Sequence, residues 1–178
     1  LQKAAIAVFP WMDDAANMVV FGDSRGGSAN FQTFENLLTY YIGTDNKEGV
    51  EKVASALNKG ISQKKYSRNN VGWTGLCTYT ATIPSVRAES NERASYSPHH
   101  RFITMKNWEG DYKMMFNLYG GKKGYHLTPN GLALQFYAYG YALAPDAAAY
   151  ESYWSKDHGY HQSPTGSNTV LPGYTEGE

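Results

Sequence analysis

The stretch RFITMKNWEGDYKMMFNLY, residues 101–119, decides the fold of the second half of this 178-residue chain. Two runs rich in aromatic, branched and other apolar residues, 101–108 and 112–119, flank the tripeptide Glu-Gly-Asp at 109–111. A short break that contains glycine between two such runs predicts a β-hairpin.

The residues that follow repeat this pattern. The runs 132–139 and 141–145 flank Gly140 and predict a second hairpin, and 169–171 predicts a further short strand. Successive hairpins without helices between them favour an antiparallel sheet, and we expect it to stack on a second sheet as a β-sandwich. The predicted fold class is therefore mainly β, with an antiparallel multi-stranded β-sandwich over residues 66–178.

Residues 1–65 predict a short helical segment before the sheet. Phe31, Phe34, Leu37, Leu38 and Tyr41 lie at helical spacing and share one face. A capping box of Asp45 and Glu48 predicts the start of a second helix, with an apolar stripe of Val50, Val53, Ala54 and Leu57, and Gly60 predicts its end. The two helices are expected to form a pair.

Composition excludes several classes of function. Lys plus Arg equals Asp plus Glu at 16 each, so no overall field draws the chain to nucleic acid or to an anionic membrane. No apolar stretch is long enough to span a bilayer. Fifteen tyrosines, four tryptophans and 18 glycines are typical of β-rich proteins that handle sugars.

Two further features concern processing and redox chemistry. Leu1 is preceded by neither an initiator Met nor a secretory signal, so we expect the chain to be a piece of a longer protein. Cys77 is the single cysteine, which excludes an internal disulfide and a thiolate zinc cluster. We expect its side chain to be a small buried hydrophobe.

Residues 19–24, Val-Val-Phe-Gly-Asp-Ser, resemble the nucleophile block of the GDSL esterases. Such an enzyme places its serine at the end of a parallel strand and needs a His preceded by a nearby Asp to activate the hydroxyl. Asp157 and His161 are the only late pair, one residue farther apart than the usual Asp-x-x-His of that family. Ser24 as an esterase nucleophile is thus a minor alternative.

Histidines and aromatic residues near the C-terminus permit two more interpretations. His126, His158 and His161 could bind a metal, but the last two lie in a stretch rich in Gly and Ser with no helix to fix their spacing. Tyr153, Trp154 and Tyr160 could stack on a sugar, and aromatic residues near strand ends are equally often packing at the rim.

The most specific pattern is GGKKGYHLTPNGLALQFYAYGYALAPD at 120–146, followed by SNTVL at 167–171. It resembles the core signature of the heparinase II/III family, in which a Gly-rich turn leads to His-x-His-x-Asp, then to a strand ending in Tyr-x-x-Gly, an Asp-x-Gly turn and a His-Asn-Thr-Val strand. Upstream, Phe-Gly-Asp-Ser at 21–24 resembles the end of the family's helical toroid domain, and HRFITMK at 100–106 resembles its first sheet strand.

This chain also departs from the family pattern. The second His and the Asp of His-x-His-x-Asp are Thr128 and Asn130, and Ser167 stands where the last His would be. Members with a zinc ion take it from the second His, the turn Asp and the last His, so Asp146 is the only retained ligand. One carboxylate cannot hold zinc firmly, and we predict no family-type zinc site, while another divalent cation stays possible.

The resemblance implies cleavage of a uronic-acid polysaccharide by β-elimination. It assigns His126 to the sheet side of the catalytic site, and Tyr153 or Tyr160 to substrate contact near the reacting sugar. The candidate substrate-binding residues are Tyr125, Asn130, Trp154 and Asn168. The other catalytic groups, an Asn, a His or Arg, and a Tyr, are implied to come from a preceding toroid domain, of which residues 1–65 would be the end.

The resemblance further implies a secreted or periplasmic protein whose partner is an acidic polysaccharide or oligosaccharide. The isolated chain would then be inactive without the toroid domain. Two alternatives stay open: a non-catalytic carbohydrate-binding or scaffold β-sandwich, suggested by the lost His and Asp positions, and the esterase.

Overall fold

The computed structural model divides the chain into two compact units. The helical unit contains Leu1–Met18 and Gly27–Glu92, and the sheet unit contains Val19–Gly26 and Arg93–Glu178. The structure describes residues 2–20, 27–86, 93–99, 101–107, 113–120, 132–145, 154, 156 and 166–169. Residues 66–86, which the sequence analysis placed with the sheet domain, belong to the helical unit.

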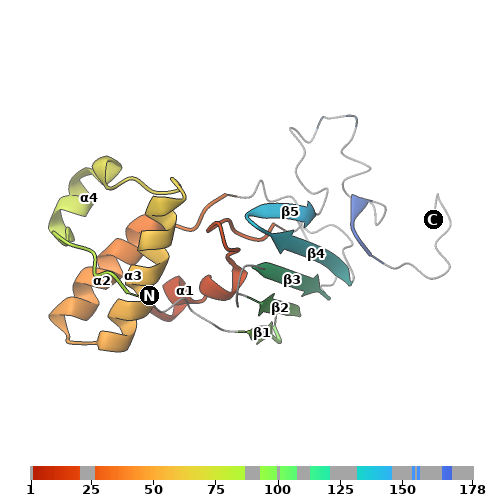
Figure 1. Ribbon diagram of the computed structural model, residues 1–178, viewed down its shortest axis with the longest axis horizontal. Helices are drawn as coiled ribbons and strands as arrows, with labels where there is room; N and C mark the ends of the chain where they lie inside the picture. Colours follow the sequence, from red (N-terminus) through yellow and green to blue (C-terminus); the bar gives the residue numbers. More distant parts are fainter. Residues whose placement is uncertain are drawn as a thin grey trace. The chain divides into compact units, whose positions relative to one another are not determined.

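The helical unit is built around two antiparallel helices (Figure 1). These are α2, Phe31–Gly43, and α3, Lys47–Ser62. The shorter elements are α1 (Gln2–Ile6), η1 (Phe9–Trp11), η2 (Arg68–Asn70) and α4 (Gly72–Cys77). The predicted helix pair is thus present, and each of its helices extends about two residues beyond the predicted end.

The connection between α2 and α3 explains why the predicted cap was wrong by one residue. The N-cap of α3 is Asn46, whose Oδ1 accepts a hydrogen bond of 2.9 Å from the Gly49 amide. Asp45 instead has φ of 51° and closes α2, while the Asn46 amide donates to the Tyr41 carbonyl at 2.9 Å. This is a Schellman motif, so the carboxylate of Asp45 is not the cap of the next helix.

Gly60 does not end α3, contrary to the prediction. It lies inside the helix, where a Cβ would lie 2.7 Å from Cδ1 and Cζ of Phe31 on α2. Gly49, three turns earlier, faces the ring of Tyr41 in the same way, at 2.7 to 2.9 Å. The two glycines therefore let α3 lie directly against two aromatic rings of α2.

The end of α3 comes at Ser62, two residues after Gly60. Lys64 has φ of 56°, and the Lys65 amide donates to the Gly60 carbonyl at 2.8 Å. This is a second Schellman motif, with a lysine at the position that glycine usually occupies. Aromatic and aliphatic side chains then fill the core between η1, α2 and α3: Phe9, Phe31, Phe34, Leu38, Val53 and Leu57.

The sheet unit contains five antiparallel strands in the order β1-β2-β3-β4-β5 (Figure 1). They are β1 (Ala94–Ser97), β2 (Phe102–Asn107), β3 (Met114–Tyr119), β4 (Ala133–Ala138) and β5 (Tyr141–Ala144). Both predicted hairpins are confirmed, because β2 pairs with β3 and β4 pairs with β5. The strand predicted at 169–171 is not seen at Thr169, and residues 170 and 171 lie outside the described part of the chain.

Two predictions about the fold class need correction. The described strands form one open sheet, so the predicted β-sandwich is not confirmed. The chain is also not mainly β: 38% of the described residues are helical and 25% are in strands. The main reason is the length of α2 and α3, 13 and 16 residues, which the sequence analysis treated as a short lead-in.

One face of the sheet buries a row of polar side chains. Thr104, Asn117 and Gln135 lie opposite one another in β2, β3 and β4, and each is at most 1% exposed. Thr104 Oγ1 donates to Asn117 Oδ1 at 2.9 Å, and Gln135 Nε2 donates to the Val20 carbonyl. These bonds compensate only in part for burial of the polar groups, because Asn117 Nδ2 has no hydrogen-bond partner among the described residues. The bond from Gln135 ties residue 20 to the sheet.

Candidate functional site

Strand direction gathers three connections at one end of the sheet. Ser97 pairs with Phe102, Phe102 with Tyr119, and Tyr119 with Ala133. The turn at 98–101 and the connection at 120–132 therefore start and finish at the same end. The chain leaves β5 toward this end too, because Ala144 lies beside Phe136 on β4. We call it the loop end of the sheet.

A pocket of about 260 Å³ lies at the loop end. Its lining combines one cationic, one aromatic and several apolar side chains: Tyr96, Pro98, Arg101, Ile103, Leu118, Gly120 and Leu132. Tyr96 pairs with Ile103, and Ile103 with Leu118, so these three residues share the sheet face opposite the buried polar row. A pocket of this size suits a single ring, since pockets for drug-sized ligands hold roughly 300–1000 Å³.

Two residues of this pocket have unusual backbone conformations. Arg101 has φ of 50° and Leu132 has φ of 58°, and both are exposed. The Arg101 carbonyl accepts a hydrogen bond of 2.8 Å from the Gly120 amide, which joins the turn before β2 to the residue after β3. Left-handed conformations of this kind cost of order 1–2 kcal/mol in residues other than glycine. The pairing of the neighbouring strands holds Arg101 and Leu132 in these conformations.

Most of the predicted site residues lie outside the described part of the chain. Tyr125, His126 and Asn130 fall within the connection between β3 and β4, and Asp146, Tyr153 and Tyr160 follow β5. The structure therefore does not show whether these side chains meet, and their roles stay predictions. What it does show is that the flanking described residues, Gly120, Leu132 and Pro145, belong to the loop end.

Two predicted substrate-binding residues are described. Trp154 is 94% exposed. Asn168 Nδ2 donates to the Pro145 carbonyl at 2.7 Å, and the Asn168 carbonyl accepts from the Leu134 amide of β4 at 2.8 Å. Asn168 thus brings the chain back to the loop end after residue 145. This is a positioning role that its place in the motif did not reveal.

The sequence analysis missed Arg101 and Tyr96 as site residues. It identified residues 100–106 only as a strand, because a motif comparison does not say which residues of neighbouring strands share a face. The signal that could have found them is the register of two hairpins: Tyr96, Ile103 and Leu118 fall on one face only once three strands are aligned.

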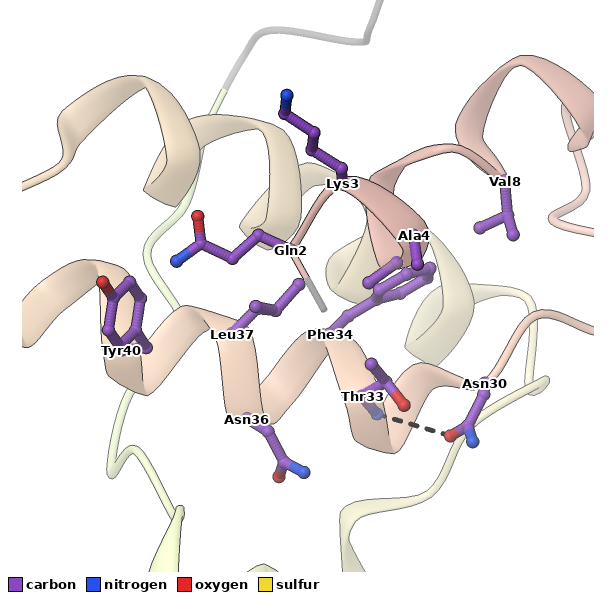
Figure 2. Close-up of a pocket in the computed structure, with 11 residues that line it drawn as sticks. Gln2, Lys3, Ala4, Val8, Asn30, Thr33, Phe34, Asn36, Leu37 and Tyr40 are labelled. Atoms are coloured by element: carbon purple, nitrogen blue, oxygen red, sulfur yellow. Dashed lines mark hydrogen bonds between the residues drawn. The ribbon is translucent and has the colours of Figure 1, made fainter.

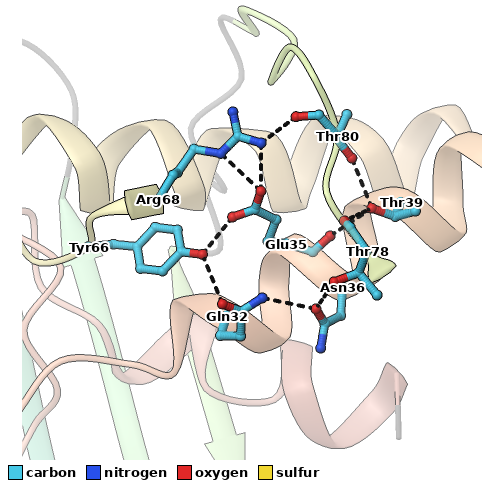
Figure 3. Close-up of polar contacts among 8 residues, drawn as sticks. All are labelled: Gln32, Glu35, Asn36, Thr39, Tyr66, Arg68, Thr78 and Thr80. Atoms are coloured by element: carbon cyan, nitrogen blue, oxygen red, sulfur yellow. Dashed lines mark hydrogen bonds and ion pairs between the residues drawn. The ribbon is translucent and has the colours of Figure 1, made fainter. Parts of the chain in front are cut away.

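A second cluster of ionisable side chains surrounds a buried carboxylate in the helical unit (Figure 3). Glu35 on α2 is 1% exposed, and its Oε1 accepts hydrogen bonds from Arg68 Nε at 2.9 Å and Nη2 at 2.6 Å. Its Oε2 accepts a bond of 2.5 Å from the Tyr66 hydroxyl. Burial raises the pKa of Tyr66 well above its ordinary value, and the bond to Glu35 raises it further.

The arrangement around Glu35 is structural rather than catalytic. Arg68 also donates to the Thr80 carbonyl and lies 4.3 Å from the centre of the Tyr79 ring. Both carboxylate oxygens are engaged, and the raised pKa of Tyr66 keeps its proton in place at neutral pH. The cluster therefore fastens the irregular segment 66–80 to α2.

The helical unit also has a groove of about 1020 Å³ between α1 and α2 (Figure 2). Apolar side chains, Ala4, Val8, Phe34 and Leu37, alternate with polar ones along its edges, Gln2, Asn30, Asn36 and Tyr40. Lys3 is the one ionisable amine or acid in this lining. These lining residues include no acid–base pair.

Two findings about metal ligands and membrane-spanning helices hold for the described residues. Among them there is no group of three or more His, Cys, Asp or Glu side chains that could hold a metal. The family-type zinc ligands do not fit this chain either, since Thr128 and Ser167 replace two of the three. Within the same described ranges, no helix is both long and apolar enough to cross a membrane.

Two predictions about single residues, Cys77 and Ser24, differ in outcome. Cys77 is exposed on α4, so the prediction of a buried thiol was wrong. Its helix has six residues, and the neighbouring Trp73 and Leu76 are exposed as well. Ser24 lies outside the described residues. All described strand pairs are antiparallel, whereas the esterase needs its serine at the end of a parallel strand.

Comparison with known proteins does not assign the chain to a class. No protein-family model matches the sequence, and no curated protein matches it either. The resemblance to the heparinase II/III family therefore depends on the motif residues at 120–146 and 167–171 alone.

Proposed function

We propose that this chain is part of a polysaccharide lyase that cleaves uronic-acid-containing polysaccharide by β-elimination. The observation that supports the proposal is the position of the predicted site segments at the loop end of the sheet. The two segments that contain the predicted site residues, 120–132 and 145–169, both begin and end at described residues of that end. A small pocket with an arginine and a tyrosine lies at the same place.

The reaction requires removal of the proton at C5 of the uronate and loss of the oxygen at C4. The proton becomes sufficiently acidic only when donors or cations neutralise the adjacent carboxylate. A base must take the proton, and an acid must protonate the leaving oxygen. We propose that His126 shares in this proton transfer from the sheet side, with Tyr153 or Tyr160 beside the reacting sugar.

The remaining parts of the proposal follow from the same resemblance. Tyr125, Asn130, Trp154 and Asn168 would contact or order the substrate, and the sheet would be one layer of a sandwich. A helical toroid domain of the parent protein would supply the Asn, the His or Arg, and the Tyr of the opposite wall. Secretion or export to the periplasm would bring the enzyme to its polymer. No step requires a metal ion.

The test uses the parent protein with alginate and with heparan sulfate. Elimination creates a double bond between C4 and C5, which absorbs in the ultraviolet and distinguishes a lyase from a hydrolase. His126→Ala is expected to lower the rate of product release by about 100-fold, the lower range for a lost acid–base group. His158→Ala removes an imidazole outside the matched motif and should leave the rate unchanged. Full activity in His126→Ala would remove this residue from the mechanism.

The alternative is a carbohydrate-binding protein without catalysis, favoured by Thr128 and Asn130 at positions where the family has His and Asp. It predicts binding of the same polymers with no unsaturated product from the parent protein.

A further inference from the structure

We propose that the pocket at the loop end is a binding subsite for a uronate residue. In this subsite the Arg101 guanidinium binds the sugar carboxylate, and the Tyr96 ring supports the sugar face. This inference deepens the proposed function and takes its ligand class from it, but it concerns residues that the lyase motif does not include.

The charge of Arg101 favours an anionic ligand. Arg101 is exposed, and within the described part of the chain no carboxylate forms an ion pair with it. Its planar fork of donors matches a carboxylate in two parallel hydrogen bonds.

The apolar part of the pocket suits a sugar ring. Tyr96 is 63% exposed, so its ring is accessible to a ligand. Ile103 and Leu118 continue the same sheet face behind it. A tyrosine offers a rigid apolar surface together with a hydroxyl that can donate or accept a hydrogen bond. The volume of about 260 Å³ has room for one ring and excludes a helix or a β-strand as the ligand.

The backbone holds the arginine in place before any ligand arrives. Arg101 stands in a four-residue turn between paired strands, and its carbonyl is bonded to Gly120. Binding groups on such fixed elements lose less conformational entropy when they bind. The backbone at Arg101 is therefore fixed by β1, β2 and β3, and Gly120 and Leu132 of the lining flank the segment that contains His126.

The experiment measures binding of two matched oligosaccharides to the 178-residue chain by nuclear magnetic resonance titration. One is an oligomannuronate, and the other is a manno-oligosaccharide with the same linkage and length but no carboxylates. We expect the acidic ligand to bind more tightly by up to about fivefold, as one solvent-exposed ion pair allows. Equal affinities for the two ligands would overturn the proposal.

Single substitutions then show which side chain is responsible for the preference for the acidic ligand. Arg101→Gln should abolish the preference for the acidic ligand, while Tyr96→Leu should lower the affinity for both ligands by the same factor. Arg93→Gln is the matched control, because it makes the same substitution next to Lys106 at the opposite end of β1. Amide spectra that keep the strand signals exclude unfolding as the cause. An Arg101→Gln chain that retains the preference would refute the assignment. So would displacement of the acidic sugar by adenosine monophosphate at an equal or lower concentration, which would show a nucleotide site.

The outcomes separate the subsite from the lyase. Loss of the preference in Arg101→Gln, with no unsaturated product from the parent protein, supports the subsite and contradicts the lyase. Unsaturated product with an unchanged preference in Arg101→Gln supports the lyase and contradicts the subsite.

Discussion

Replacement of Gly60 by alanine should destabilise the helical unit, although alanine is the better helix former. Gly60 lies within α3, where the change from glycine to alanine would ordinarily raise the free energy of unfolding by about 1 kcal/mol. Here the new methyl group would lie 2.7 Å from two carbons of the Phe31 ring. That distance is about 0.8–1.3 Å shorter than the optimal carbon–carbon contact of about 3.5–4.0 Å.

The Phe31 ring has little freedom to move away. It is 2% exposed, and its centre is 5.6 Å from the ring of Phe34 and 5.8 Å from that of Tyr66. Overpacking in such a core costs about 1–3 kcal/mol. Because this cost exceeds the gain in helix propensity over most of its range, we expect a net loss of stability of up to about 2 kcal/mol.

Urea denaturation followed by helical circular dichroism measures this loss. Gly43→Ala is the control, since a Cβ at Gly43 meets no atom within 4 Å, and that variant should be neutral or slightly stabilised. Phe31→Leu should partly restore the Gly60→Ala variant, with a coupling energy of about 1 kcal/mol in a double-mutant cycle. A Gly60→Ala chain more stable than the parent, or additive effects in the cycle, would refute the packing argument.

Two further perturbations test the helical unit by the same denaturation assay. Arg68→Met leaves the buried Glu35 carboxylate without its cation and should cost about 3–5 kcal/mol, while adding Glu35→Leu should recover most of the loss. A double variant as unstable as Arg68→Met would contradict this account of the ion pair. Lys64→Gly should stabilise the chain by up to about 1 kcal/mol because φ is 56°, whereas Lys65→Gly, next to it and without a positive φ, should not.

Local patterns in the sequence predicted the elements well where one pattern dominated. Runs of apolar residues around Gly110 and Gly140 predicted two hairpins, and apolar spacing predicted α2 and α3. Boundaries were less predictable because adjacent residues compete for the same role. Asp45 and Asn46 can both cap a helix, and only the left-handed turn at Asp45 decides between them.

Features that depend on alignment between strands could not be read from one segment. Thr104 and Asn117 are polar, and a sequence pattern would assign them to a solvent-facing side. Both are buried, and Thr104 Oγ1 donates a hydrogen bond to Asn117 Oδ1 across the two strands, while Asn117 Nδ2 has no partner among the described residues. The pocket with Tyr96 and Arg101 likewise exists only after β1, β2 and β3 are in register.

The position of Cys77 has a practical consequence. The chain has one thiol, and it lies exposed on α4 of the helical unit. A maleimide dye or a nitroxide spin label can therefore be attached at a single place without removing other cysteines. Paired with a second cysteine introduced at Lys156, it would report the distance between the two units in solution and any change in that distance on addition of an oligosaccharide. The same thiol will cross-link two chains under air oxidation, so such measurements require a reductant until the label is attached.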